Sequence, residues 1–385
     1  MRTTFRRKWH STRWAWAAVA VVALAVSACS TPSDQAASSG TQAADTQAAD
    51  TSSSAAGTQA ETAQSTDSGS SEISSATESA APANDGPLNI AYMSFAVANS
   101  FDAPMLAAAQ AVAADNNAKV TVFDANNDPQ VQHSQLQDVI TSKKYDGIIT
   151  QPIFGTGLVD LVTQAVDQGI KVVNINQILG PDLTTAEPQV PGMSASVALV
   201  PTDLGKNIGE QTVAACAARS LDPCTVGYLY DIKASALDVA MRDGFNEATK
   251  GSPIKIVAEG ESFFTATVAL GAVQDMLTAH PDIQVIVGSD QGIQGAVQAI
   301  DAAGKAKDIS LVGYGGSATG VAGVAAGTWF STVLMTPASE GRLGMQALIK
   351  AIRTGEDSGA INPTEGLPEV ITKDNASSFT AEWLG

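Results

Sequence analysis

From Asn89 to Met105 the chain reads NIAYMSFAVANSFDAPM, and the rest of the sequence is organised around this stretch. It begins with a short apolar run bounded by turn-type residues, which is typical of a buried strand. A loop with Asn99, Phe101 and Asp102 follows, and Pro104 stands at the start of a predicted helix, where proline is tolerated. In open α/β sheets, loops that leave the carboxyl ends of strands bind ligands. The stretch therefore predicts a binding loop whose aromatic, amide and carboxylate groups suit a sugar or polyol.

Strand-like and helix-like runs alternate throughout residues 87–385. Ten apolar runs predict strands, at 88–93, 120–124, 147–150, 171–175, 194–200, 225–230, 254–259, 285–288, 310–314 and 330–335. Amphipathic runs lie between most of them, and repeated strand–helix units form parallel sheets with helices on both faces. About 300 residues with ten strands fit two doubly wound lobes better than one. We therefore expect an α/β fold with two parallel-sheet lobes.

The charge of the chain excludes one class of partner, and its first 28 residues indicate export. The 385 residues carry a formal net charge of −18, which argues against nucleic acid because nucleic-acid binding requires a basic face.

The N-terminus has five basic residues, an apolar run at 14–26 and small residues before Cys29, as in a secretory signal peptide. The apolar run is too short to span a membrane comfortably.

The sequence VSAC at 26–29 resembles the lipobox of bacterial lipoproteins, which implies cleavage before Cys29 and attachment of lipid to it. An ordinary signal peptide with an incidental cysteine is the alternative. Lipid chains would anchor the protein at the extracytoplasmic face of the cell membrane. Residues 30–86 are Ser, Thr, Ala, Gln and Gly with scattered acids, and they include no Lys or Arg. Such a composition buries too little apolar surface to offset its ordering entropy, so 29–86 is predicted to be a disordered tether.

Cys216 and Cys224 are the even pair that remains after Cys29 is set aside. In an exported protein such a pair favours a short disulfide, and two free buried thiols are the alternative. Neither cysteine has a histidine nearby, and the three histidines of the chain form no catalytic or zinc-binding arrangement. We therefore expect no enzyme activity, no metal and no cofactor.

Six stretches of the folded region follow one family's order along the chain. They are NIAYMSFAVANSFDAPM, VFDANNDPQVQHSQLQDVITSKKYDGIITQP, GIKVVNIN, PTDLGKNIGE, DMLTAHPDIQVIVGSDQGIQGAVQAIDAAGK and ISLVGYGG. Through them, the region from Leu88 to about Thr372 resembles the type I periplasmic sugar-binding proteins, the ribose/galactose-binding group of ABC-transporter solute receptors. The resemblance implies two lobes that close on a ligand about a hinge, with three crossovers near Thr202, Met335 and Leu367.

The same resemblance implies domain boundaries and ligand positions. The first lobe would comprise 87–202 with 336–366, and the second lobe 203–335 with 367–385. The ligand-binding positions, matched to the family or standing beside a matched position, are Asn99, Phe101, Asp102, Gln151, Asn176, Gln177, Phe264, Ser289, Asp290 and Tyr314.

Several charged residues of the family are missing from this chain. Asn176 and Gln177 stand where the family has an Asp-Arg pair, and Gly315 stands where it has a later aspartate. The family's second-lobe arginine falls near Val239, with Arg242 displaced along the helix. Charged, bidentate groups clamp sugar hydroxyls tightly. We therefore predict a less charged cleft, and the resemblance carries over the fold but not ribose as the ligand.

Some of these ligand positions also have a structural interpretation. Phe101 and Phe264 could be core side chains, although two rings on facing lobe edges favour ligand walls. Asp102 and Asp290 could be carboxylates that cap helix N-termini. The Tyr314 hydroxyl needs a partner if it is buried, and a ligand is one such partner.

We expect a lipid-anchored solute-binding protein of an ABC importer, a monomer that works with a membrane permease and its ATPase. A small neutral sugar, polyol or sugar-like solute would stack between Phe101 and Phe264. The reduced charge also admits a less polar ligand, such as an aromatic or cyclic alcohol. A sensor that reports ligand to a membrane receptor is the alternative role on the same fold.

Overall fold

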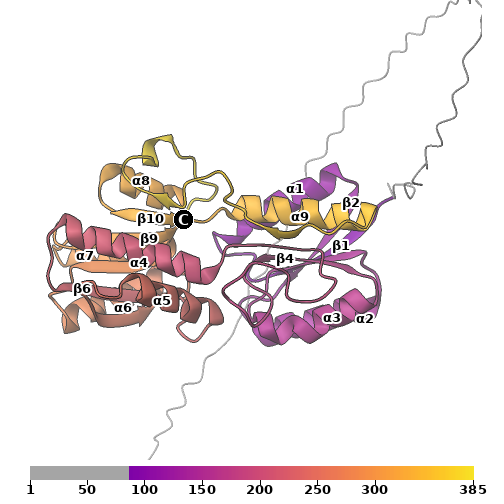
Figure 1. Ribbon diagram of the computed structural model, residues 1–385, viewed down its shortest axis with the longest axis horizontal. Coiled ribbons are helices and arrows are strands. Elements are labelled where there is room, and N and C mark those ends of the chain that lie inside the picture. Colours follow the sequence, from indigo (N-terminus) through magenta and orange to yellow (C-terminus); the bar gives the residue numbers. More distant parts are fainter. Residues whose placement is uncertain (1–85) are drawn as a thin grey trace, which may run out of the picture. The chain divides into compact units, whose positions relative to one another are not determined.

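Two α/β lobes make up residues 86–385, the part of the chain that this computed structural model describes (Figure 1). Each lobe is built on one six-stranded sheet. The predicted signal peptide, the predicted lipidation site Cys29 and the predicted linker up to residue 85 lie outside the described residues. Among residues 86–385, no helix combines the length and the apolar character that a membrane crossing requires. The predicted fold class, two parallel-sheet α/β lobes, is confirmed.

The first lobe has a wholly parallel sheet in the order β11-β5-β4-β3-β1-β2. Its strands are β1 (Leu88–Ser94), β2 (Ala118–Asp124), β3 (Gly147–Thr150), β4 (Lys171–Asn176), β5 (Ala195–Ala198) and β11 (Gly359–Ile361). Its helices are α1 (Asp102–Asp115), α2 (Pro129–Ser142), η1 (Gly155–Leu158), α3 (Val159–Asp167) and α9 (Pro337–Thr354). Successive side chains of a strand point to opposite faces, so Tyr92 of β1 packs with α1 and α9 whereas Met93 packs with α2 and α3. Figure 1 shows these two pairs of helices on opposite faces of the sheet.

The second lobe repeats this plan in the order β12-β10-β9-β8-β6-β7, with only β12 antiparallel. Its strands are β6 (Cys224–Tyr230), β7 (Ile254–Glu261), β8 (Val285–Ser289), β9 (Ser310–Gly315), β10 (Ser331–Leu334) and β12 (Val370–Ile371). Its helices are α4 (Pro201–Ala218), α5 (Ala236–Ala248), α6 (Ala266–Ala279), α7 (Asp290–Ala302), α8 (Ala318–Ala326) and η2 (Ala376–Ser378). Tyr228 of β6 packs with α4 and α5, whereas Leu229 packs with α6 and α7.

The chain passes between the lobes at three places. It leaves β5 of the first sheet for α4, returns from β10 of the second sheet to α9, and leaves β11 for β12. The first two connections are only two residues long, 199–200 and 335–336. Helix α9 then packs on α1 and β4 of the first lobe although it directly follows a strand of the second. A few residues at the ends of such elements are where hinge movements between lobes take place in general.

A disulfide joins Cys216 in the last turn of α4 to Cys224 at the start of β6. Their Cα atoms are 5.9 Å apart, and both side chains are buried in the core between α4, α5 and the second sheet. The predicted disulfide is therefore confirmed, and the alternative of two free thiols is wrong. The bond closes a short loop, which limits its effect on the unfolded chain to about 2–3 kcal/mol.

Candidate functional site

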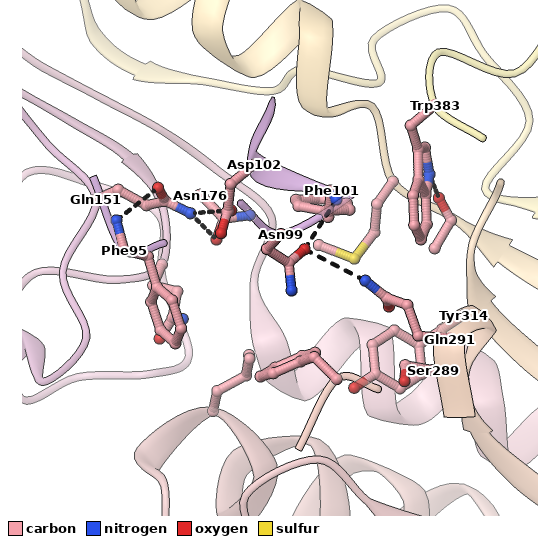
Figure 2. Close-up of a pocket in the computed structure, with 15 residues that line it drawn as sticks. Phe95, Asn99, Phe101, Asp102, Gln151, Asn176, Ser289, Gln291, Tyr314 and Trp383 are labelled. Atoms are coloured by element: carbon pink, nitrogen blue, oxygen red, sulfur yellow. Dashed lines mark hydrogen bonds between the residues drawn. The ribbon is translucent and has the colours of Figure 1, made fainter. Parts of the chain in front are cut away.

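A cavity lies between the facing edges of the two lobes. The space inside it, about 500 Å³, includes a part that is open to solvent. Most of its lining comes from residues at or just beyond the carboxyl ends of strands, the expected place for ligands in open α/β sheets. The lining residues, most of them labelled in Figure 2, are Phe95, Asn99, Phe101, Asp102, Gln151, Asn176, Gln177, Leu237, Phe264, Ser289, Gln291, Tyr314, Gly315, Met335 and Trp383.

The loop after β1 is shaped by its own amide side chain. Asn99 Oδ1 accepts a hydrogen bond from the backbone N–H of Phe101 (2.8 Å), an Asx turn that fixes the approach to α1. The backbone carbonyl of Asn99 then accepts from Ala103 N–H (3.0 Å) and so continues into the first turn of the helix. Across the cavity, Gln291 Nε2 of α7 donates to the same Asn99 Oδ1 at 3.4 Å (Figure 2). The Asn99 side chain thus faces the second lobe.

A chain of hydrogen bonds forms the polar wall of the first lobe. Gln151, which follows β3, accepts from Phe95 N–H at its Oε1 (3.2 Å) and donates from its Nε2 to Asp102 Oδ1 (2.6 Å). The same Nε2 makes a longer contact of 3.5 Å with Asn176 Oδ1. Asn176 Nδ2 in turn donates to Glu340 Oε2 of α9 (2.9 Å). Each amide orientation is fixed by its neighbours, so the wall is preorganised (Figure 2).

Two carboxyl groups of this wall titrate far above their ordinary range. Burial raises the pKa of Asp102 to about 7, although the hydrogen bond from Gln151 opposes the shift. Burial likewise raises the pKa of Glu340 to about 8, against the hydrogen bond from Asn176. Glu340 Oε1 is buried and has no hydrogen-bond partner within residues 86–385. Near neutral pH Asp102 is therefore partly protonated and Glu340 largely protonated.

Aromatic side chains of both lobes meet at the cavity. The rings of Phe95 and Phe264 lie 6.3 Å apart in an edge-on arrangement, and those of Phe101 and Trp383 lie 5.2 Å apart. Offset and edge-on pairs of this kind stabilise by about 0.5–1.5 kcal/mol beyond the area they bury. These pairs therefore contribute to holding the two edges of the cavity together.

Two lining residues have a left-handed backbone that is uncommon for residues other than glycine. Phe264 has φ +54° and Asn176 has φ +67°. The asparagine tolerates this region, but a bulky aromatic residue is strained there. The strained turn is held by Phe263 N–H, which donates to Asp231 O (3.0 Å), and by Phe264 N–H, which donates to Ser262 Oγ (3.2 Å). Such strain concentrates at functional sites, which favours a role for the Phe264 ring.

In the second lobe a buried carboxylate organises the wall. Asp231 accepts hydrogen bonds from the hydroxyl groups of Ser262, Ser289 and Tyr314. Burial raises the pKa of Asp231 above its ordinary value. The partner that the Tyr314 hydroxyl was predicted to need is therefore this carboxylate, and the Tyr314 ring is left to line the cavity.

The structure brings nine of the ten predicted ligand positions to the cavity, all except Asp290. Asp290 is fully buried and accepts from Ser317 N–H and Thr332 Oγ1, both at 2.7 Å. It anchors the start of α8 to β10, so placing it in the ligand set was wrong. Its capping alternative is also wrong, because Ser289 caps α7 by accepting from Gly292 N–H (3.1 Å).

The capping interpretation of Asp102 fails as well. Asp102 is the first residue of α1, and no side chain caps that helix. Its carboxylate turns to Gln151 instead and lines the cavity.

Several residues of the site were missed. Phe95 follows β1 directly and could have been found by the strand-end rule that identified Asn99. Gln291 lies in the first turn of α7 beside predicted positions. Trp383, near the end of the chain, and Glu340, behind the lining, carry no local sequence signal that points to this cavity.

Comparison with known proteins agrees with this geometry. A D-allose-binding periplasmic protein of Escherichia coli K12 is 28% identical over 255 residues, covering 63% of this chain and 75% of the relative. A ribose import binding protein of Salmonella typhimurium is 27% identical over 258 residues, covering 67% and 82%. The crystal structure of an ABC transporter solute binding protein from Mycobacterium smegmatis with bound glycerol is 25% identical at a TM-score of 0.66, covering 78% of this chain and all of the other. The family model for the periplasmic binding protein domain matches residues 90–357, well over half of the chain, and the chain therefore belongs to that family.

Proposed function

We propose that this protein is the extracytoplasmic solute-binding component of an ABC importer and that it binds a small polyhydroxylated solute, a sugar or polyol, between its lobes. The observation that supports this most is the cavity itself, in which fixed amides and aromatic rings of both lobes converge. Relatives named for D-allose and ribose, and a similar structure with bound glycerol, support the same class of ligand.

The lining suits such a solute in two ways. Rings such as Phe95 and Phe264 offer apolar faces to the C–H side of a sugar or cyclitol. Asn99, Gln151 and Gln177 offer both donors and acceptors, as hydroxyl groups require. A solute that lacks these hydroxyls would leave the partly buried amides of Asn99 and Gln177 without those partners, which favours discrimination against it.

Binding is coupled to closure about the three interlobe connections. A solute that contacts both lobes binds the closed arrangement better than the open one and so shifts the population toward it. The closed form would then present both lobe surfaces to a permease, which with its ATPase carries out the transport. In this role the protein binds and releases the solute and makes or breaks no covalent bond. We propose further that the protein acts as a monomer anchored through lipid on Cys29.

A ligand screen tests the proposal. The purified protein is heated in the presence of pentoses, hexoses, linear polyols, cyclitols and small aromatic alcohols, and hits are titrated by calorimetry. At 100 times its dissociation constant, a ligand adds about 2.7 kcal/mol to the free energy of unfolding, which is a clear thermal shift. A sugar or polyol among the hits supports the proposal. If only aromatic alcohols bind, the ligand is an aromatic alcohol and not a sugar or polyol. If folded protein shows no thermal shift with any compound, the proposed function is contradicted.

A further inference from the structure

The cavity is lined by one acid and by no basic side chain. Of the fifteen described residues that line it, only Asp102 carries a carboxyl group, and none is Lys, Arg or His. Arg242, the arginine displaced from the family's position, is engaged elsewhere: it donates to Tyr230 Oη (2.9 Å) and pairs with Glu259 (3.0 Å). The lining therefore holds a carboxyl group with no counter-charge of its own.

Further buried acids stand directly behind this lining. Glu340 bonds to the lining residue Asn176, Asp231 bonds to the lining residues Ser289 and Tyr314, and the side chain of Asp290 lies beside Gly315. None of these acids, nor Asp102, takes part in an ion pair between described residues. In their ionised form, acids in a low-dielectric surrounding attract a cation more strongly than exposed acids do, and a nearby ammonium group favours that ionised form.

The remaining walls are aromatic. Five rings line the cavity, and they come from both lobes: Phe95, Phe101, Phe264, Tyr314 and Trp383. The face of an aromatic ring carries partial negative charge and attracts an ammonium group within about 6 Å. Rings alone would serve a neutral sugar equally well. Rings together with a carboxyl group and no basic residue are the arrangement that recognises an amine.

Resting on the solute-binding function proposed above, we propose that the solute of this cleft carries a protonated amino group, as an amino sugar or an aminated polyol does. The ammonium group would lie at Asp102 against the rings, and the hydroxyl groups would bind the amides of Asn99 and Gln177. Such a cation supplies the counter-charge that the buried carboxylate lacks, which offsets the desolvation of both groups. A neutral solute of the same shape leaves that carboxyl group, which accepts from Gln151, without a counter-charge.

Matched ligand pairs test the inference without any substitution. Calorimetry on the purified protein compares glucosamine with glucose, galactosamine with galactose, and an aminated cyclitol with inositol. The N-acetyl derivatives, in which the amine is converted to an uncharged amide, serve as controls for the charge. We expect at least one amine to bind tenfold or more tighter than its hydroxyl counterpart and its acetylated form. A hydroxyl or acetylated member that binds as tightly or more tightly overturns the inference while the proposed function stands, and no binding by any probe overturns both.

A pair of variants on helix α1 locates the recognition. Asp102→Asn removes the lining carboxylate, and we expect the preference for the amine over the alcohol to fall tenfold or more. Asp115→Asn removes one exposed negative charge from the same helix and should leave the preference unchanged. An unchanged preference in Asp102→Asn overturns the role of this carboxylate. If that variant does not fold, the ligand pairs measured on the unaltered protein decide the question.

Discussion

The indole N–H of Trp383 donates a hydrogen bond of 2.7 Å to the carbonyl oxygen of Gly315, and the ring fills the space that a side chain at position 315 would need. A Cβ atom placed on Gly315 would lie 2.7 Å from Cζ2 of Trp383. Gly315 and Trp383 therefore form one structural feature. The glycine stands where the family has an aspartate, and the tryptophan ring occupies the space beside it. The neighbouring Glu382 accepts from Ser339 N–H (2.8 Å) of α9, so this terminal segment contacts both lobes.

Replacing Trp383 with alanine should weaken solute binding by about thirtyfold, the effect of truncating a well-packed aromatic anchor by about 2 kcal/mol. The substitution removes a lining ring and its contact with Phe101. Calorimetric titration of the best ligand measures the loss. Leu384→Ala is the matched control, because Leu384 is the next residue and is 80% exposed. If the two variants bind the solute with equal affinity, Trp383 does not contribute to the site.

Gly315→Ala should destabilise the protein, and the loss should depend on Trp383. Gly315 has φ +133°, which strains any L side chain, and the added methyl group would clash with the indole. In a double-mutant cycle of thermal unfolding, Gly315→Ala should cost less in the Trp383→Ala background than in the original protein, by about 1 kcal/mol or more. Strictly additive effects would mean that the ring does not restrict position 315.

The fold was readable from sequence because apolar runs of four or more residues alternate with amphipathic ones. All ten predicted strands exist, and their ends differ from the observed ends by no more than two residues. The two strands that were missed, β11 and β12, have three and two residues, too few for a periodic pattern to register. Their strand character depends on pairing with β5 and β10, which are distant along the chain.

The site was readable only where it follows the rule that ligands bind at strand ends. Asn99 was selected by that local rule, whereas Gln151 and Asn176, which also lie at or after strand ends, were selected through the family resemblance. Trp383 and Glu340 reach the site through tertiary packing across long stretches of chain, which single-sequence patterns do not report. For Asp290 the same rule misleads. This acid follows a strand end, but its carboxylate anchors the start of α8 to β10 and does not line the cavity.

The ligand-free protein should be more stable in mild acid than in mild alkali. Burial raises the pKa of Asp290 to about 6, Asp102 to about 7 and Glu340 to about 8, whereas the same groups in the unfolded chain titrate near 4. Between these values the folded state holds protons that the unfolded state has released, so the free energy of unfolding falls as pH rises. Each group contributes a slope of at most about 1.4 kcal/mol per pH unit.

Thermal unfolding measured from about pH 5 to about pH 8 checks this expectation. Glu340→Gln should flatten the upper part of the profile, since the amide keeps the shape of the side chain without titrating. A melting temperature that stays level or climbs across the range would show that these carboxyl groups are not desolvated as described.

The lipidation of Cys29 is still a prediction from the sequence. Changing Cys29 to Ala removes the thiol to which lipid would be attached, so most of the exported protein should move from the membrane fraction to the soluble fraction. Fractionation followed by mass spectrometry of the mature N-terminus measures both consequences. A Cys216→Ala variant, which keeps Cys29, should stay with the membrane. Continued membrane association of the Cys29 variant would favour another mode of attachment.

Phe264→Gly should separate stability from binding. Glycine adopts the left-handed backbone of position 264 without strain, which offsets part of the stability lost with the ring's contact to Phe95 and with the greater flexibility of glycine in the unfolded chain, so the lobe should stay folded with only a small change in melting temperature. Solute affinity should nevertheless fall by about tenfold or more, because the ring that faces Phe95 across the cavity is lost. Phe263→Gly is the matched control. Phe263 has φ +48° but is half exposed and lies outside the lining, so the same relief of backbone strain should occur there without a loss of affinity. If Phe264→Gly instead unfolds the lobe while Phe263→Gly does not, the ring belongs to the core, and its strained backbone reflects packing and not ligand binding.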